Sequence, residues 1–312
     1  MDVQVLTLEP IPPFRLDLTV WALRRRPENE IDRWDGRVYR RTLVIAGRPV
    51  AMAVTPLGPP EAPRLQVVLT ASELPSGAEE AAARALERLL GLRVDLGPFY
   101  RKLEGDPRLG PWIVRFKGLK PPRFPTLFET LVNAIACQQV TLTLGIRLLN
   151  RLAAAFGRRV EGAPQAPPAF PQPEDLAGQD PAALQALGFS RQKARSLLAL
   201  AEAVGSGAVD LEAWERLADA EAMTRLQGLR GIGRWSAEYT LLRGMGRLHI
   251  FPGDDVGARN HLQRWLGRRR PFDYEGVRRA LAPWQPYAGL VYFHLLLKHL
   301  EEQGILGVPT TA

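Results

Sequence analysis

Two adjacent carboxylates, Asp254 and Asp255, follow the turn Phe251-Pro252-Gly253 and come before a helical pattern that starts near Val256. One carboxylate at a helix start caps the helix, and we expect Asp254 to take that role. The helix dipole keeps a carboxylate at such a position ionised, and an ionised carboxylate can stabilise positive charge. Asp255 is compatible with both capping and this chemistry.

Two glycines one residue apart, Gly231 and Gly233, lie between two stretches of helical periodicity. They let the chain turn tightly and expose backbone amides at the start of the next helix, where the dipole favours an anion. The segment therefore predicts a helical hairpin that can hold a phosphate, with a plain helix–helix turn as the alternative. Three hydrophobic residues would pin this hairpin and two arginines would flank it: Leu226, Leu229, Ile232, Arg230 and Arg234.

The charge of the chain is concentrated around these motifs. The 312 residues carry a formal net charge of +8. The segment 225–270 has ten arginines and three acids, so it contributes ten minus three, or +7, of that excess. A basic segment of this kind points to a polyanionic partner, most often nucleic acid. The alternative is a composition bias, because arginine is used more than lysine throughout the chain.

Other features of the composition exclude several classes of protein. No run of about 18 apolar residues is present, so we expect no membrane span. The first thirteen residues lack a basic region, so we expect no signal peptide and a cytoplasmic, nucleoid-associated location. The single cysteine, Cys137, excludes an intrachain disulfide framework, a Cys-rich zinc site and an iron–sulfur cluster. We expect its thiol to be a small buried hydrophobe in an apolar helix.

The elements that must position these residues fall into two parts. The first hundred residues indicate mixed α/β structure, with a β-hairpin formed by 37–45 and 50–55 and a further strand over 64–70. Ser76 has capping-box spacing and would open a helix that runs to about Leu92. We place a domain boundary after residue 97, which gives an N-terminal domain (1–97) and a helical domain (98–312).

The second part follows helical periodicity. We expect residues 127–156 to form one long helix or a broken pair. The stretch 162–173 holds five prolines and indicates a surface loop between helices. Further helices are predicted over 182–204 (two short ones), 211–226, 235–244, 256–266, 274–281 and 286–300, with the hairpin at about 226–240.

The segment from Gly228 to Asp255 resembles the signature of the helix-hairpin-helix DNA glycosylases. Its Gly-Ile-Gly-Arg-Trp run (231–235) and its Asp-Asp pair are most similar to the bacterial 3-methyladenine DNA glycosylase II branch. Residues 135–141, 187–194 and 283–288 and the opening 11–14 also resemble that branch. The resemblance covers nearly the whole chain and is strongest over 226–262. It implies an α+β fold, in which an N-terminal antiparallel sheet resembling that of TATA-binding protein comes before a two-lobed helical domain.

The resemblance also implies an activity. Asp255 stands where the family has its catalytic aspartate, which stabilises the oxocarbenium-like sugar and orients or deprotonates water. Family members with lyase activity carry a lysine at the position of Trp235, so we expect a monofunctional enzyme that excises alkylated purines and leaves an abasic site. Trp235 and Tyr239 share a helix face and, with Trp284 from another element, would form the base pocket. The alternative for these rings is an ordinary core position, and Asp254 would be structural or a secondary contact.

Further roles are implied for DNA binding. Gln139 falls at the family's wedge position with Gln138 beside it, and two helix-surface glutamines are the alternative. Amides of Gly231, Gly233 and Ser236, flanked by Arg234, would bind a phosphate of double-stranded DNA. The carbonyls of Gln227, Leu229 and Ile232 would hold a structural Na⁺ or K⁺. No cofactor is needed for catalysis, and a monomer suffices.

Three other functions stay open at this point. A non-catalytic hairpin module would bind DNA without needing Asp255. A glycosylase for neutral lesions such as hypoxanthine, uracil or oxidised guanine would use the same fold. A helical metabolic enzyme with a phosphate-binding turn would leave the basic segment unexplained. His249 and His261 lie near the acidic pair, but they lack metal-ligand spacing, so we expect no catalytic metal.

Overall fold

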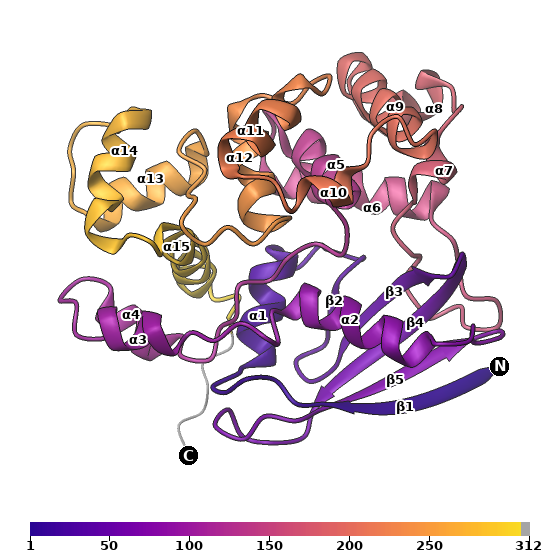
Figure 1. Ribbon diagram of the computed structural model, residues 1–312, viewed down its shortest axis with the longest axis horizontal. Coiled ribbons are helices and arrows are strands. Elements are labelled where there is room, and N and C mark those ends of the chain that lie inside the picture. The colour runs from indigo at the N-terminus through magenta and orange to yellow at the C-terminus, as the bar shows by residue number, and fades with distance from the viewer. Residues whose placement is uncertain (307–312) are drawn as a thin grey trace.

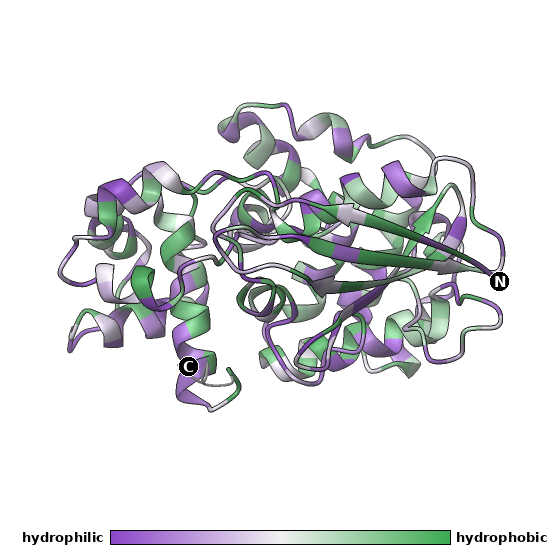
Figure 2. Cartoon of the chain, turned by 90° about the horizontal axis from the view of Figure 1, so that it is seen from below, coloured by the Kyte–Doolittle hydropathy of each residue, from purple (hydrophilic) through white to green (hydrophobic). Residues whose placement is uncertain are grey.

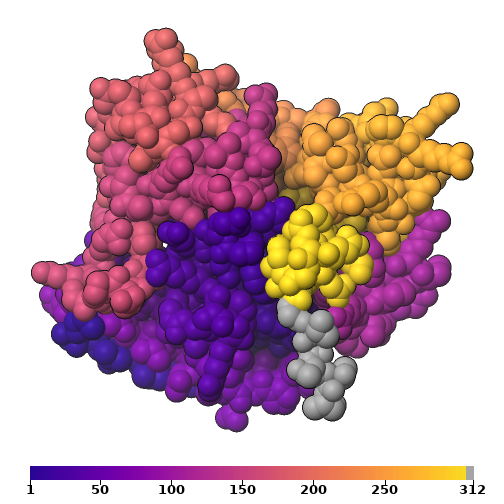
Figure 3. All heavy atoms as spheres, turned by 180° about the vertical axis from the view of Figure 1, so that it is seen from behind, coloured from indigo at the N-terminus to yellow at the C-terminus, as the bar shows by residue number. Residues whose placement is uncertain are grey.

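The computed structural model describes residues 1–306 and places two helical lobes on top of an N-terminal sheet layer (Figure 1). Seen from behind, the two lobes stand side by side above that layer (Figure 3). This arrangement confirms the predicted α+β fold. The last six residues of the predicted helical domain, 307–312, lie outside the described part. Among residues 1–306, no helix combines the length and apolar character needed to cross a membrane.

The sheet is antiparallel, with strand order β1-β5-β4-β3-β2. Ala46 and Gly47 make the β3–β4 turn at φ 46° and 76°, as a two-residue hairpin requires. The hairpin and the third strand were predicted, but β1 was not. Figure 2 shows hydrophobic and hydrophilic residues along the same strands, as expected of a sheet with one buried face. The strands are β1 (Asp2–Leu8), β2 (Arg33–Trp34), β3 (Tyr39–Ile45), β4 (Arg48–Pro56) and β5 (Leu65–Ala71).

Helix α2 (Ala78–Leu90) packs against the sheet through buried Ala82, Leu86 and Leu89. Its N-cap is Gly77, and no side chain caps it. The capping box predicted at Ser76 is therefore wrong, because the chain enters this helix through a glycine in the left-handed region.

The first lobe contains the hairpin. Of the two forms predicted for residues 127–156, one long helix or a broken pair, the structure has the pair, because Thr141 caps the second helix by accepting a hydrogen bond from the Leu144 amide. Residues 211–226 form two helices where one was predicted. The helices of this lobe are α5 (Leu127–Cys137), α6 (Leu142–Phe156), α7 (Pro173–Leu176), α8 (Pro181–Ala186), α9 (Arg191–Gly205), α10 (Leu211–Trp214), α11 (Asp219–Gly228) and α12 (Arg234–Arg243).

The second lobe consists of α13 (Val256–Trp265), α14 (Tyr274–Leu281), the 3₁₀ turn η1 (Ala282–Trp284) and α15 (Ala288–Glu302). Helices α3 (Gly97–Leu103) and α4 (Gly110–Arg115) share its core. Helix α1 (Leu16–Arg24) contributes Leu18 and Ala22 to the same core. Packing therefore crosses the predicted boundary at residue 97, since α1 of the N-terminal part lies against the last helix of the chain.

Several contacts join the first lobe to the N-terminal layer, and two of them involve fully buried side chains of β3. Arg41 on β3 is fully buried and donates to Asp32 Oδ1 at 2.7 Å and to both carboxylate oxygens of Glu129 on α5 at 2.6 Å. The proline-rich stretch is the second link, because Thr42 donates to the carbonyl oxygen of Pro167 at 2.5 Å. Residues 167–171 are buried, so the predicted surface loop is wrong for that half.

Candidate active site

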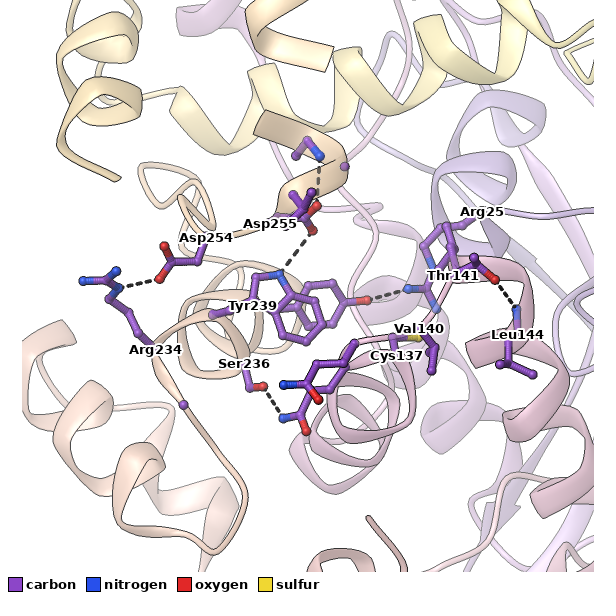
Figure 4. Close-up of a pocket in the computed structure, with 18 of the residues that line it drawn as sticks. Arg25, Cys137, Val140, Thr141, Leu144, Arg234, Ser236, Tyr239, Asp254 and Asp255 are labelled. Atoms are coloured by element: carbon purple, nitrogen blue, oxygen red, sulfur yellow. Dashed lines mark hydrogen bonds and ion pairs between the residues drawn. The ribbon is translucent and has the colours of Figure 1, made fainter. Parts of the chain in front are cut away.

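A pocket of about 1180 Å³ opens where the two lobes and the end of α1 meet. Figure 4 shows its lining side chains converging from segments far apart in the sequence. These are the end of α1, the α5–α6 turn, α9, the hairpin with α12, the loop before α13, and α15.

Asp255 lies in this pocket and accepts three hydrogen bonds. Its Oδ1 accepts from the Ala258 amide at 2.9 Å, which makes Asp255, and not Asp254 as predicted, the N-cap of α13. Its Oδ2 accepts from Trp235 Nε1 at 3.2 Å and from the Tyr292 hydroxyl at 3.1 Å. All three of these groups are donors, so the residue that caps α13 also presents its carboxylate to the pocket as an acceptor.

Glu238 on α12 anchors the loop that carries Asp255 by hydrogen bonds. Glu238 accepts from the Gly253 amide at 3.0 Å and from the Tyr274 hydroxyl. Burial raises the pKa of Glu238, although both hydrogen bonds act in the opposite direction. A Cβ at position 253 would lie 2.7 Å from the Tyr274 ring, so glycine is needed for this close approach. These contacts fix the direction in which Asp255 enters the pocket.

Asp254 lies at the rim of the pocket and pairs with Arg234. The Arg234 Nε lies 2.6 Å from Asp254 Oδ2, and its guanidinium stacks 3.8 Å from the centroid of the Tyr274 ring. Figure 4 shows this pair pointing away from Asp255. Asp254 therefore has a structural contact, and Arg234 is already partly neutralised.

The aromatic side of the pocket differs in one residue from the prediction. The rings of Trp235 and Tyr239 line the pocket with centroids 5.5 Å apart. Trp284 does not line it: this side chain is 4% exposed, packs 4.9 Å from Trp265 in the core of the second lobe and donates to Asp106 at 3.1 Å. The prediction for Trp284 is wrong because η1 turns the indole into that core.

Tyr292 on α15 also lines the pocket, although it was not among the predicted site residues. Burial raises the pKa of its phenol well above the usual range, and the Asp255 carboxylate adds to that shift. The hydroxyl therefore stays a donor to Asp255. A tyrosine within an apolar helix needs a partner for its hydroxyl, and this was the signal available in the sequence.

Arg25 was missed as well. It follows α1 at φ 62° and is 5% exposed. Its Nη1 donates to the Tyr239 hydroxyl at 2.9 Å and its Nη2 donates to Asn133 Oδ1 at 2.7 Å. Arg24-Arg25-Arg26 looks like a solvated charge run in the sequence, and no local pattern reveals that its first two members are buried.

The two predicted wedge glutamines differ in the structure. Gln138 turns inward, and its Nε2 donates to the Gly231 carbonyl and to Ser236 Oγ, both at 2.8 Å. Gln139 is exposed and sits at φ 53°, a conformation that few residues other than glycine adopt. Lys193 steadies the turn by donating to the Ala136 carbonyl at 2.9 Å and the Gln138 carbonyl at 2.7 Å. Of the two glutamines, only Gln139 is exposed at the mouth of the pocket.

The hairpin has the predicted form. Leu226 and Ile232 are buried, and Leu229 packs against the same core. Gly231 has φ 81°, and a Cβ there would lie 2.5 Å from Ser196 Oγ, so only glycine fits. Gly233 is exposed and caps α12, whereas Ser236 is buried with its hydroxyl accepting from Gln138.

Part of the positive charge in the segment 225–270 is not available to a polyanionic partner. Arg243 is fully buried and donates to the carbonyls of Ala22 and Leu23, so part of the +7 segment is structural.

Cys137 ends α5 at the pocket wall, where it is half-buried, and burial raises the pKa of its thiol. Within residues 1–306, no three His, Cys, Asp or Glu side chains gather in a way that could hold a metal ion.

Comparison with known proteins agrees with this geometry. The family model described as HhH-GPD superfamily base excision DNA repair protein matches residues 132–286. DNA-3-methyladenine glycosylase 2 from Escherichia coli is 30% identical over 291 residues, which cover 93% of this chain and 95% of that protein. The solved 3-methyladenine DNA glycosylase of Archaeoglobus fulgidus is 26% identical and superposes with a TM-score of 0.81 over 94% of this chain and 97% of that chain. A Schizosaccharomyces pombe 3-methyladenine DNA glycosylase, solved with abasic DNA, is 25% identical with a TM-score of 0.54 over 70% of this chain and 97% of that chain. The chain therefore belongs to the HhH-GPD superfamily of base excision DNA repair proteins.

Proposed function

We propose that this protein is a monofunctional DNA glycosylase that flips alkylated purines, of the 3-methyladenine and 7-methylguanine type, out of double-stranded DNA and hydrolyses their N-glycosidic bond. One observation carries the proposal. Asp255 accepts hydrogen bonds from Trp235 and Tyr292 inside a pocket that the helical hairpin and the turn with Gln139 border. The named activities of the similar proteins support the same substrate class.

The residues divide the reaction between them. The flipped base stacks against Trp235, and a positively charged purine gains roughly 0.5 to 2 kcal/mol on such a face. As the bond between C1′ and the base nitrogen breaks, its electron pair leaves with the base and positive charge develops on the sugar. The Asp255 carboxylate stabilises that charge and takes a proton from the water that attacks C1′. The products are a free base and an abasic site.

Strand cleavage is not part of the proposal. A lyase needs an amine that attacks C1′, and Trp235 cannot supply one. Lys193 is the one lysine among the described residues that line the pocket. Its Nζ donates to two carbonyls of the α5–α6 turn, so it is held away from attack.

DNA binding is assigned to the rim. The amides of the turn at Gly231 and Gly233 bind a backbone phosphate. Gln139 fills the gap that the flipped nucleotide leaves. The carbonyls of Gln227, Leu229 and Ile232 hold a structural monovalent cation. That of Leu229, the C-cap of α11, accepts from the Ile232 amide at 3.1 Å and keeps a second lone pair for the ion. One copy of the chain holds every one of these parts, so a monomer acts alone.

The proposal is tested with methylated duplex DNA, wild-type protein, Asp255→Asn and the matched neighbour Asp254→Asn. We expect wild type to release 3-methyladenine or 7-methylguanine, with strand breaks only after alkali. Asp255→Asn should bind the DNA and release nothing, whereas Asp254→Asn keeps most of the activity. If wild type released only uracil or hypoxanthine, the substrates would be neutral lesions and not alkylated purines. Equal DNA binding with no release by wild type would make this protein a binding module.

A further inference from the structure

The buried guanidinium of Arg25 has no charged partner. Its two Nη atoms donate to a tyrosine hydroxyl and an asparagine carbonyl, and its Nε has no partner among the described residues. Among residues 1–306, no carboxylate forms an ion pair with the Arg25 guanidinium. A buried charge without a counter-charge is unfavourable for folding. Arg243 is buried in the same way, but it donates to two backbone carbonyls and does not line the pocket, whereas Arg25 does.

The charge of Arg25 faces the pocket. Arg25 lines the pocket together with Tyr239, whose hydroxyl points at the guanidinium (Figure 4). Since that hydroxyl accepts a hydrogen bond from Arg25, its own proton is free, and it donates to no other group among the described residues. A hydroxyl polarised by a cation is a stronger donor. The floor of the pocket is therefore a positively charged donor end, and the Trp235 ring stands beside it.

We propose that Arg25 is a positioning residue that sets lesion specificity: through the Tyr239 hydroxyl it favours excision of neutral purines with a carbonyl acceptor, such as hypoxanthine, relative to purines that carry positive charge. This inference rests on the proposed glycosylase function and deepens it. The aromatic face serves cationic bases, and the Arg25–Tyr239 pair serves neutral ones.

The chemistry explains the difference between the two kinds of lesion. In both cases water forms the new bond to C1′, and the electron pair of the broken C1′–N bond goes to the base. A cationic base leaves as a neutral molecule, and the proton from water is released to solvent. A neutral base leaves with negative charge until it accepts that proton, so a positive donor end stabilises its departure. The same positive end opposes binding of a cationic base.

The test uses single-turnover base release from two duplexes, one with hypoxanthine opposite thymine and one with 7-methylguanine opposite cytosine. We expect Arg25→Met to lower the rate ratio of hypoxanthine to 7-methylguanine by about tenfold or more, as the loss of a charge-assisted hydrogen bond implies. Arg25→Lys should restore most of the ratio. Tyr239→Phe, which keeps the cation and removes the hydroxyl, should shift the ratio in the same direction as Arg25→Met.

A matched control separates specificity from folding. Arg24 is 6% exposed, donates to the carbonyls of Pro27, Asn29 and Trp34, and does not line the pocket. Arg24→Met should change stability and leave the ratio at the wild-type value.

The inference is overturned if folded Arg25→Met or Tyr239→Phe keeps the wild-type ratio, or if wild type excises 7-methylguanine but no hypoxanthine. Failure of wild type on both duplexes would instead refute the proposed function.

Discussion

Arg41 and Arg25 are both buried arginines, but they are treated in opposite ways. Arg41, where the sheet meets α5, contacts two carboxylates, Asp32 and Glu129. Arg25, which lines the pocket, donates to the neutral oxygens of Tyr239 and Asn133 and lies over the Phe124 ring. The charge of Arg41 is neutralised and joins β3 to α5, whereas the charge of Arg25 has no carboxylate partner and can act on a ligand in the pocket. The difference teaches that an uncompensated buried charge indicates a functional site when it also lines a pocket; Arg243, which is as buried and donates only to carbonyls, does not line it.

The same contrast applies to carboxylates and gives the largest expected effect. Asp255 in the pocket and Asp32 at the sheet junction both accept hydrogen bonds from side chains. Asp255→Asn should lower single-turnover base release by about 10³-fold, because the charge that stabilises the transition state is lost. Asparagine can still cap α13 with its one acceptor oxygen, but its amide then faces the Trp235 and Tyr292 donors, so the free energy of unfolding should fall by about 1 to 3 kcal/mol. Asp32→Asn should instead lower stability and leave the rate per folded molecule unchanged, and the reverse pattern would break the comparison.

The next largest effect concerns stability at the junction. Arg41→Met leaves Asp32 and Glu129 buried without their partner, so the free energy of unfolding should fall by about 3 to 5 kcal/mol. Urea denaturation followed by circular dichroism measures this change. A fall below about 1 kcal/mol would show that the ion pairs around Arg41 contribute little, and the contrast with Arg25 would lose its structural half.

A smaller effect is expected from Tyr292→Phe, which removes one donor to Asp255. We expect base release to slow by about tenfold, the effect of one hydrogen bond to a charged group. Because burial raises the pKa of Tyr292, the phenol stays protonated, and the loss should be the same between about pH 6 and pH 9. A loss that varies over this range would mean that Tyr292 titrates and does more than donate a hydrogen bond.

The smallest effect is predicted for the exposed turn. Gln139→Ala should weaken binding to lesion-containing duplex by about threefold to tenfold, since the gap left by a flipped base then has no plug. Gln138→Ala tests the other half of the pair and should act through stability, because Gln138 bonds to Gly231 and Ser236. Fluorescence anisotropy measures both affinities. Equal effects on affinity at equal stability would contradict the distinction between the two glutamines.

The sequence predicted the parts of the site that are encoded within a few residues of each other. The hairpin glycines and the acidic pair are local patterns, and Trp235 and Tyr239 share one helix turn. Arg25, Tyr292 and Trp284 depend on how α1, η1 and α15 pack against distant elements, and no spacing in the chain encodes that packing. The cap was assigned to the wrong aspartate because Asp254 and Asp255 are equally suitable by type.

The fold follows the same rule. The β3–β4 hairpin was predictable from its turn, whereas β1 pairs with β5 about sixty residues away along the chain, and such pairing leaves little local signal. The division at residue 97 was drawn where strand patterns end. Side-chain packing crosses residue 97, because α1 and α15 share one hydrophobic core.

The central claim is that the pocket receives a flipped base and that Asp255 then drives its release. The most direct measurement places 2-aminopurine beside 7-methylguanine in a duplex and follows its fluorescence and the free base on addition of Asp255→Asn. The account predicts that fluorescence rises on binding, because the base is flipped and stacking is lost, while no free base appears. Release at the wild-type rate, or binding without any rise in fluorescence, would contradict it.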